Sequence, residues 1–129
     1  MTVPADLRYT KDHEWTKGGT GPGAEITIGI TAFAVEQLGD ITMIDLPKEG
    51  EAVRKGAVFG TVESVKAVSD LFAPCSGKVV KVNDPLGGTP ETLNEDCYDE
   101  GWMIQVELSE AVADLMSAAQ YEEYLKEQG

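Results

Sequence analysis

The sequence contains few of the residues from which metal sites, thiol chemistry and nucleic-acid interfaces are built. Its 129 residues include one histidine, two cysteines and ten lysines and arginines, against 23 aspartates and glutamates. The formal charge of -13 repels a phosphate backbone, so we expect no nucleic acid among the partners. The same charge favours solubility and steers the molecule towards basic patches on other proteins.

Long apolar stretches and targeting signals are missing as well. No apolar run approaches the roughly 20 residues that a membrane-spanning helix needs, which predicts a protein without a membrane partner. Residues 1–6 have neither the basic and apolar parts of a secretory signal nor the arginine-rich character of a transit peptide. We therefore expect a cytoplasmic protein, or a mitochondrial matrix protein only if a presequence has been removed. The length fits one domain over residues 1–129.

Catalytic motifs are absent too. His13 has no second histidine at a zinc-binding spacing, and Cys75 and Cys97 each stand alone without a Cys-x-x-Cys pair. We interpret both cysteines as reduced structural thiols and predict no metal site. The glycine-rich stretch at residues 18–23 lacks the Gly-Lys-Ser/Thr ending of a phosphate-binding loop, so we expect a flexible turn there. We predict no catalytic residue and a non-catalytic protein.

What the sequence does contain is a series of short β segments separated by Gly, Pro and Asp turns, which is typical of an all-β sandwich or barrel. We expect a polar loop at residues 84–90. The predicted strands lie near residues 14–17, 25–30, 40–46, 57–63, 68–74, 78–83 and 102–108.

Helices are expected in three places. Thr31 is placed to cap a short helix through Leu38, which Gly39 would end in a left-handed conformation. Two more helices are predicted near the end of the chain, the first of them capped by Ser109. Their apolar faces would carry Val112, Leu115 and Met116 in the first and Tyr121, Tyr124 and Leu125 in the second.

Lys66 stands at a reversal between two of the predicted strands. A strand, a glycine turn and a second strand occur on either side of it, which we interpret as a weak internal repeat. A lysine at such a tip projects any attached group outwards, but the tip does not supply the desolvation that lowers the pKa of a Schiff-base lysine. This geometry fits an ordinary solvated lysine as well as an attachment site.

The residues around Lys66 are more specific. Residues 62–71 read Val-Glu-Ser-Val-Lys-Ala-Val-Ser-Asp-Leu. With this segment and several others in order, the chain resembles the H-protein family of the glycine cleavage system, the lipoyl carriers of that system, over nearly its full length. The other matching segments are residues 9–15, 28–31, 37–40, 45–47, 73–79, 82–83, 89–91, 93–94 and 101–102.

The resemblance implies a fold and a covalent cofactor. The implied fold is all-β with minor helices: a barrel-sandwich hybrid of two antiparallel sheets, with the lipoyl lysine on a hairpin and short C-terminal helices. The implied cofactor is lipoate in amide linkage to Lys66, which removes the lysine charge and adds a long apolar arm that ends in a cyclic disulfide. The neighbours in the attachment motif are Glu63, Ser64, Val65 and Ala67. Glu63 is expected to help the lipoylating enzyme recognise the hairpin.

The resemblance also implies partners. These are glycine decarboxylase with pyridoxal phosphate, a tetrahydrofolate-dependent aminomethyltransferase, dihydrolipoyl dehydrogenase with FAD and NAD, and the lipoylating enzyme. In the family mechanism the lipoyl arm takes an aminomethyl group from the decarboxylase, passes the methylene group to tetrahydrofolate with release of ammonia, and is reoxidised with NAD. We expect a monomer that meets each partner in a transient complex.

Family members lay the loaded arm in a surface groove, and Glu14 and Asp70 match positions in that groove. A carboxylate there would receive the protonated amine of the arm in a charge-assisted hydrogen bond, and Asp12 is near enough in sequence to add to the field. The chain departs from the family pattern close by. Ala32-Phe33 replaces an acidic residue followed by an aromatic residue or histidine, and Val35 replaces a glutamine.

Three alternatives remain open. Another biotinyl or lipoyl carrier domain is the first, although a biotinyl lysine usually lies between methionines and the lipoyl domains of 2-oxoacid dehydrogenases come with Pro/Ala linkers that this chain lacks. A divergent family member that donates or relays lipoate to other proteins is the second. The third is a stand-alone enzyme, which would have to catalyse without the three partners.

Overall fold

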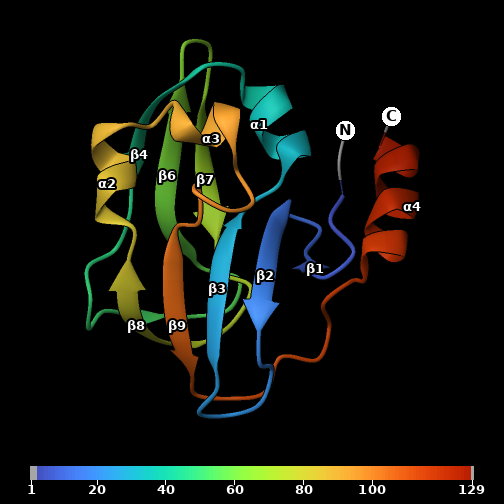
Figure 1. Ribbon diagram of the computed structural model, residues 1–129. Helices are drawn as coiled ribbons and strands as arrows, with labels where there is room; N and C mark the ends of the chain where they lie inside the picture. Colours follow the sequence, from blue (N-terminus) through green and yellow to red (C-terminus); the bar gives the residue numbers. More distant parts are fainter. Residues whose placement is uncertain (1–2, 129) are drawn as a thin grey trace.

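The computed structural model describes residues 3–128 as nine strands and four helices (Figure 1). The strands are β1 (Arg8–Tyr9), β2 (Glu14–Gly18), β3 (Glu25–Ile30), β4 (Ile41–Asp45), β5 (Ala52–Val53), β6 (Val58–Ser64), β7 (Val68–Phe72), β8 (Gly77–Val82) and β9 (Ile104–Leu108). The helices are α1 (Ala32–Leu38), α2 (Asp84–Gly88), α3 (Thr92–Glu95) and α4 (Ala118–Gln128).

The strands form two sheets in which every neighbouring pair is antiparallel. One sheet has six strands in the order β1-β2-β3-β9-β8-β5, and the other has three in the order β4-β6-β7. The six-stranded sheet lies in front of the three-stranded sheet in Figure 1. The two strands before Lys66, β5 and β6, pair with the two strands after it: β6 pairs with β7, and β5 pairs with β8. This is the predicted fold class, a barrel-sandwich hybrid with short helices.

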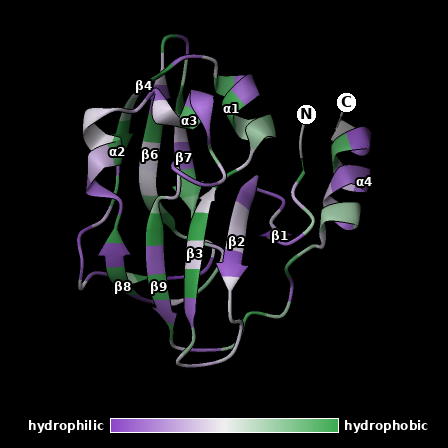
Figure 2. Cartoon of the chain, in the orientation of Figure 1, coloured by the Kyte–Doolittle hydropathy of each residue, from purple (hydrophilic) through white to green (hydrophobic). Residues whose placement is uncertain are grey.

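The core fills the space between the sheets. In β3 and β9 apolar and polar residues alternate, as Figure 2 shows, because successive side chains of a strand point to opposite faces. Ile28 of β3, Val62 of β6 and Val106 of β9 are fully buried in this cluster. Burial of such side chains stabilises the fold by about 1.5 to 3 kcal/mol each.

A second, smaller apolar cluster joins the two ends of the chain. The rings of Tyr9 and Tyr121 stack with their centroids 4.7 Å apart, and Trp15 is buried beside them. Because Tyr121 belongs to α4, this cluster holds the last helix against β1 and β2.

The prediction of a helix that begins at Ser109 is wrong. Residues 109–117 run as an extended strap whose backbone bonds to other segments: the N–H of Val112 donates to the carbonyl of Thr20, and Met116 pairs with Tyr9. The apolar spacing that suggested a helix instead places Val112 in the main core. The last helix, α4, is capped by Ser117, the residue before its first turn, which exchanges hydrogen bonds with Gln120 as in a capping box.

The predicted loop at residues 84–90 is partly helical, because α2 occupies Asp84–Gly88 and α3 follows shortly after it. Two glycines in α2 argue against a helix, but Pro85 fits the first turn and Leu86 is buried. The expected helix α1 and its Thr31 cap are confirmed: the Thr31 hydroxyl accepts the N–H of Ala34. Gly39 ends that helix with a positive φ of 83°, which glycine adopts most readily, but its ψ of -148° is not the left-handed helical conformation that we expected.

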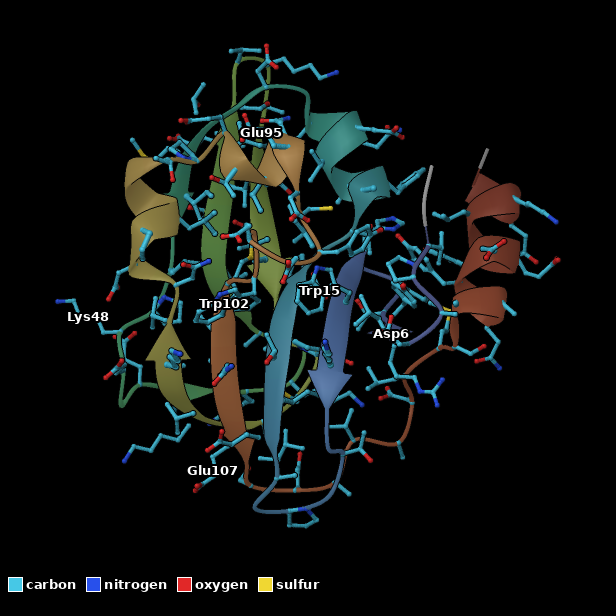
Figure 3. The ribbon with its side chains drawn as sticks, in the orientation of Figure 1. Asp6, Trp15, Lys48, Glu95, Trp102 and Glu107 are labelled. Atoms are coloured by element: carbon cyan, nitrogen blue, oxygen red, sulfur yellow. The ribbon has the colours of Figure 1, made fainter. Side chains whose placement is uncertain are left out.

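We predict that Gly29→Ala destabilises the protein. A Cβ at this position would lie 2.5 to 2.6 Å from three atoms of the ring of Trp15, which is labelled in Figure 3. The ring is held by a 3.0 Å hydrogen bond from its Nε1 to the carbonyl of Cys97. The overpacked ring should lower the free energy of unfolding by about 1 to 3 kcal/mol in urea denaturation. Gly21→Ala, which meets nothing within 4 Å, is the control. Equal stability of the two variants would contradict the prediction.

Candidate functional site

Lys66 lies at the tip of the hairpin that joins β6 to β7. A 2.8 Å hydrogen bond from the N–H of Ser64 to the carbonyl of Ala67 closes the turn, with Val65 and Lys66 as its central residues. The hairpin projects beyond both sheets at the top of Figure 1. The Lys66 side chain is exposed and forms no ion pair within residues 3–128. It is therefore accessible to a modifying enzyme.

The turn is shaped by a hydroxyl group. Neither Val65 nor Lys66 has a positive φ, which excludes the type I′ and II′ turns that usually close two-residue hairpins. Instead, the Ser64 Oγ accepts the N–H of Lys66 at 3.3 Å and that of Ala67 at 3.1 Å. The motif residue Ser64 thus satisfies the backbone of the turn from inside.

The tip of the hairpin rests against the segment that follows α1. The N–H of Val65 donates to the carbonyl of Asp40 at 3.1 Å. The Cε of Lys66 lies 3.5 Å from the place that a Cβ on Gly39 would occupy. The aliphatic stem of the lysine therefore leaves the turn along the segment that follows α1.

An exposed apolar row crosses the outer face of the three-stranded sheet beside Lys66. Met43, Glu63 and Val68 are direct neighbours on β4, β6 and β7, while the adjacent Val62 points into the core. Met43 is 57% exposed and Val68 65%. Glu63 lies between them, so a protein that contacts Glu63 also meets these two apolar side chains.

Asp70 occupies the same outer face. It is exposed and lies opposite Thr61 of β6. It lies four positions after Lys66 in the sequence, which corresponds to roughly 13 Å along an extended strand. Asp70 is therefore a solvated carboxylate on the outer face of β7, the strand that runs away from Lys66.

Glu14, by contrast, is buried at the start of β2, with 1% of its surface exposed. Its carboxyl accepts a 2.8 Å hydrogen bond from the Thr10 hydroxyl and another from the backbone of Phe72, at the end of β7. Burial raises the pKa of Glu14 to about 8, and the charge of Asp12 adds to the rise while both hydrogen bonds oppose it. Glu14 links the two sheets, a structural role that the sequence did not indicate.

Glu14 and Asp12 together line a hollow of about 400 Å³. Lys55 and Asp114 also line it and form an ion pair of 2.5 Å, which lowers the pKa of Asp114 through their hydrogen bond. Asp70 is not part of the described lining. The structure thus brings Glu14 and Asp12 together and leaves Asp70 on the outer face, about two residues along β7 from Phe72.

The departures from the family pattern lie on α1. Val35 is buried in the main core, so the loss of a polar group there does not reach the hollow. The Phe33 ring packs 4.5 Å from the ring of His13, and the N–H of Ala32 donates to the hydroxyl of Tyr98. These residues hold α1 against the rest of the molecule.

Both cysteines are buried and unpaired, as expected of structural thiols. Burial raises the pKa of Cys75 and of Cys97 to about 11, so neither is a thiolate at neutral pH. Within residues 3–128, no group of three His, Cys, Asp or Glu side chains is placed to hold a metal ion. No helix in the same range is long and apolar enough to cross a membrane.

Comparison with known proteins agrees with the family resemblance and with the fold. The family model described as Glycine cleavage H-protein matches residues 7–128. The glycine cleavage system H protein of Anaeromyxobacter sp. (strain K) is 54% identical over 99% of this chain and 99% of its own, and that of Nitratidesulfovibrio vulgaris is 51% identical over 95% and 94%. A crystal structure of the H protein from Mycobacterium marinum superposes with a TM-score of 0.87, at 42% identity over 98% of this chain and 99% of that one. The chain therefore belongs to the glycine cleavage H-protein family.

Proposed function

We propose that this protein carries lipoate in amide linkage on Lys66 and serves as the lipoyl carrier of the glycine cleavage system. The observation that carries the proposal is the exposed lysine at the tip of a closed, braced hairpin, inside the motif Glu63 to Ala67. When bound, lipoate supplies a disulfide that accepts and releases the one-carbon group. The protein itself is a carrier component and has no catalytic residue in this proposal.

The attachment site fits an acyl group on Lys66. Amide formation removes the charge of the lysine, and within the described chain no carboxylate is left without its ion-pair partner by that loss. The apolar side chains of Val65 and Val68 flank the point of attachment and are 70% and 65% exposed. Glu63, between Met43 and Val68, presents its carboxylate to the lipoylating enzyme.

The hollow beside Glu14 is the place we propose for the loaded end of the arm. A neutral carboxyl group can lose its proton when an ammonium group approaches, because the cation stabilises the charged form. Glu14 then accepts the amine in a charge-assisted hydrogen bond, and Asp12 at the rim adds negative potential. Asp70, exposed along β7, would meet the arm on its way from Lys66.

The partners in this proposal are glycine decarboxylase, the aminomethyltransferase, dihydrolipoyl dehydrogenase and the lipoylating enzyme. All four must reach one hairpin, so each complex is transient and each transfer is effectively intramolecular once the complex forms. A chain with 23 acidic and ten basic residues favours docking to basic patches on other proteins. The proposal includes a monomeric state and a cytoplasmic location, in line with the bacterial sources of the relatives.

Mass spectrometry tests the attachment. Protein isolated from lipoate-replete cells should carry the mass of one lipoyl group, and digestion should place it on Lys66. Lys66→Arg should lack that mass and fail to support glycine decarboxylation with the three partner enzymes, because arginine cannot form the amide. Lys78→Arg, a substitution at an exposed lysine of β8, is the control and should stay fully lipoylated.

An unmodified Lys66, or a biotin mass there, would overturn the proposal. If Lys66 is lipoylated but the wild-type protein does not support glycine decarboxylation, the protein is a donor or relay of lipoate and not the glycine cleavage carrier.

The burial of Glu14 predicts how stability depends on pH. Its pKa of about 8 in the folded state lies above the ordinary value of 4.5, so the folded protein holds the proton more tightly than the unfolded chain. Its contribution to stability is therefore complete below pH 4.5 and is lost as the pH rises towards 8, by at most about 1.4 kcal/mol per pH unit.

Urea denaturation at several pH values between 5 and 8 measures this slope. In Glu14→Gln, which cannot ionise, the contribution should disappear, so the wild type should lose stability relative to the variant as the pH rises. Glu107→Gln, at an exposed carboxylate of β9 that is not among the charges acting on Glu14, is the control and should keep the wild-type slope. Parallel stability curves for the wild type and Glu14→Gln would show that Glu14 ionises normally.

A further inference from the structure

The side chain of Asn94 bridges α3 and the segment that follows α1. Its Nδ2 donates to the carbonyl of Gly39 at 2.8 Å, and its Oδ1 accepts the N–H of Ile41 at 2.9 Å. The nitrogen and the oxygen of one side-chain amide therefore both form hydrogen bonds, to the two residues that flank Asp40. This pairing also fixes which end of the amide is nitrogen, because one partner is an acceptor and the other a donor.

Asp40, the residue between these two bonds, is the residue that holds the hairpin. Its carbonyl accepts the N–H of Val65 at 3.1 Å. In the described part of the chain, this is the backbone hydrogen bond that ties the central turn residues to a segment outside β6 and β7. Gly39, which precedes Asp40, is near Lys66 as well, because the lysine Cε lies 3.5 Å from the place that a Cβ on Gly39 would occupy. Asn94 therefore influences the turn around Lys66 only indirectly, through Gly39, Asp40 and Ile41.

The packing of α3 does not need the Asn94 amide. The neighbouring Leu93 is fully buried in the main core and anchors the helix, whereas Asn94 is exposed. The sheet holds the hairpin as far as Ser64, which pairs with Ile41 of β4, whereas Val65 at the tip and Val68 beyond it are exposed. The amide of Asn94 therefore acts mainly on the segment under the hairpin.

We infer that Asn94 is a positioning residue, which fixes the attachment hairpin and the direction in which the Lys66 side chain leaves it. The structural part of this inference is independent of the cofactor, and its effect on lipoylation rests on the proposed function. An ordered turn presents Lys66 to the lipoylating enzyme with less loss of conformational freedom on binding.

Hydrogen exchange on the unmodified protein tests the structural part. In Asn94→Ala the amide of Val65 should exchange about tenfold faster, because its acceptor is no longer held in place. Asn94→Asp keeps the acceptor for Ile41 and loses the donor to Gly39, so its effect should be intermediate. Glu95→Gln, on the next residue of α3 (Figure 3), is the control and should leave the exchange of Val65 unchanged.

The amide of Val106, in the middle of the six-stranded sheet, reports the stability of the whole fold. If Val65 exchanges faster and Val106 does not, Asn94 acts on the hairpin. If both amides speed up equally, or if Glu95→Gln has the same effect as Asn94→Ala, Asn94 is an ordinary stabilising residue and the inference is wrong.

Lipoylation kinetics test the functional part. The KM of the lipoylating enzyme for unmodified Asn94→Ala should rise several-fold, with kcat unchanged once the hairpin is bound, and Asn94→Asp should recover part of the loss. An unchanged KM would overturn the positioning role. If the wild-type protein accepts no lipoate at all, the proposed function is wrong. The hydrogen exchange of Val65 would still decide whether Asn94 positions the hairpin, because that test uses the unmodified protein.

Discussion

The contact between the inner faces of the two sheets is the interaction on which the rest of the structure depends. Each sheet alone would expose a continuous apolar face, and together they bury side chains such as Ile28, Val62 and Val106. Because successive residues on a strand alternate between faces, the burial of Val62 commits Glu63 to the outside. The strand that anchors the core therefore also carries Glu63, next to the Lys66 turn, to the solvent-exposed face.

Much of this arrangement could be predicted from sequence, because the signals were local. Alternating apolar residues gave the strands, Thr31 and Gly39 bounded α1, and the residues around Lys66 identified the family. Local patterns failed where long-range contacts decide. Residues 109–117 have helical spacing, yet their backbone bonds to Thr20 and Tyr9 on distant segments. The short helices α2 and α3 are too brief for any periodicity to show.

The site was predicted only in part for the same reason. The motif placed Lys66, but nothing in the sequence showed that Glu14 would be buried between β2 and the end of β7. The ion pair of Lys55 and Asp114 joins residues 59 positions apart, and Asn94 lies 55 positions from Gly39. From sequence alone, a glutamate in a strand is predicted to be exposed to solvent. Its burial becomes evident only when the packing of the second sheet is known. Such partners become visible only once the sheets are placed.

The apolar cluster around Tyr121 has a consequence for synthesis of the chain. The hydroxyl of Tyr121 bonds to both His13 and Thr31, and 108 positions separate it from His13. A nascent chain that has not yet reached Tyr121 cannot close this cluster, whereas the pairing of β6 with β7 joins residues no farther apart in sequence than Val58 and Phe72. On the ribosome, β6, Lys66 and β7 are therefore synthesised before the two ends of the protein can meet, and the C-terminal helix completes the fold last.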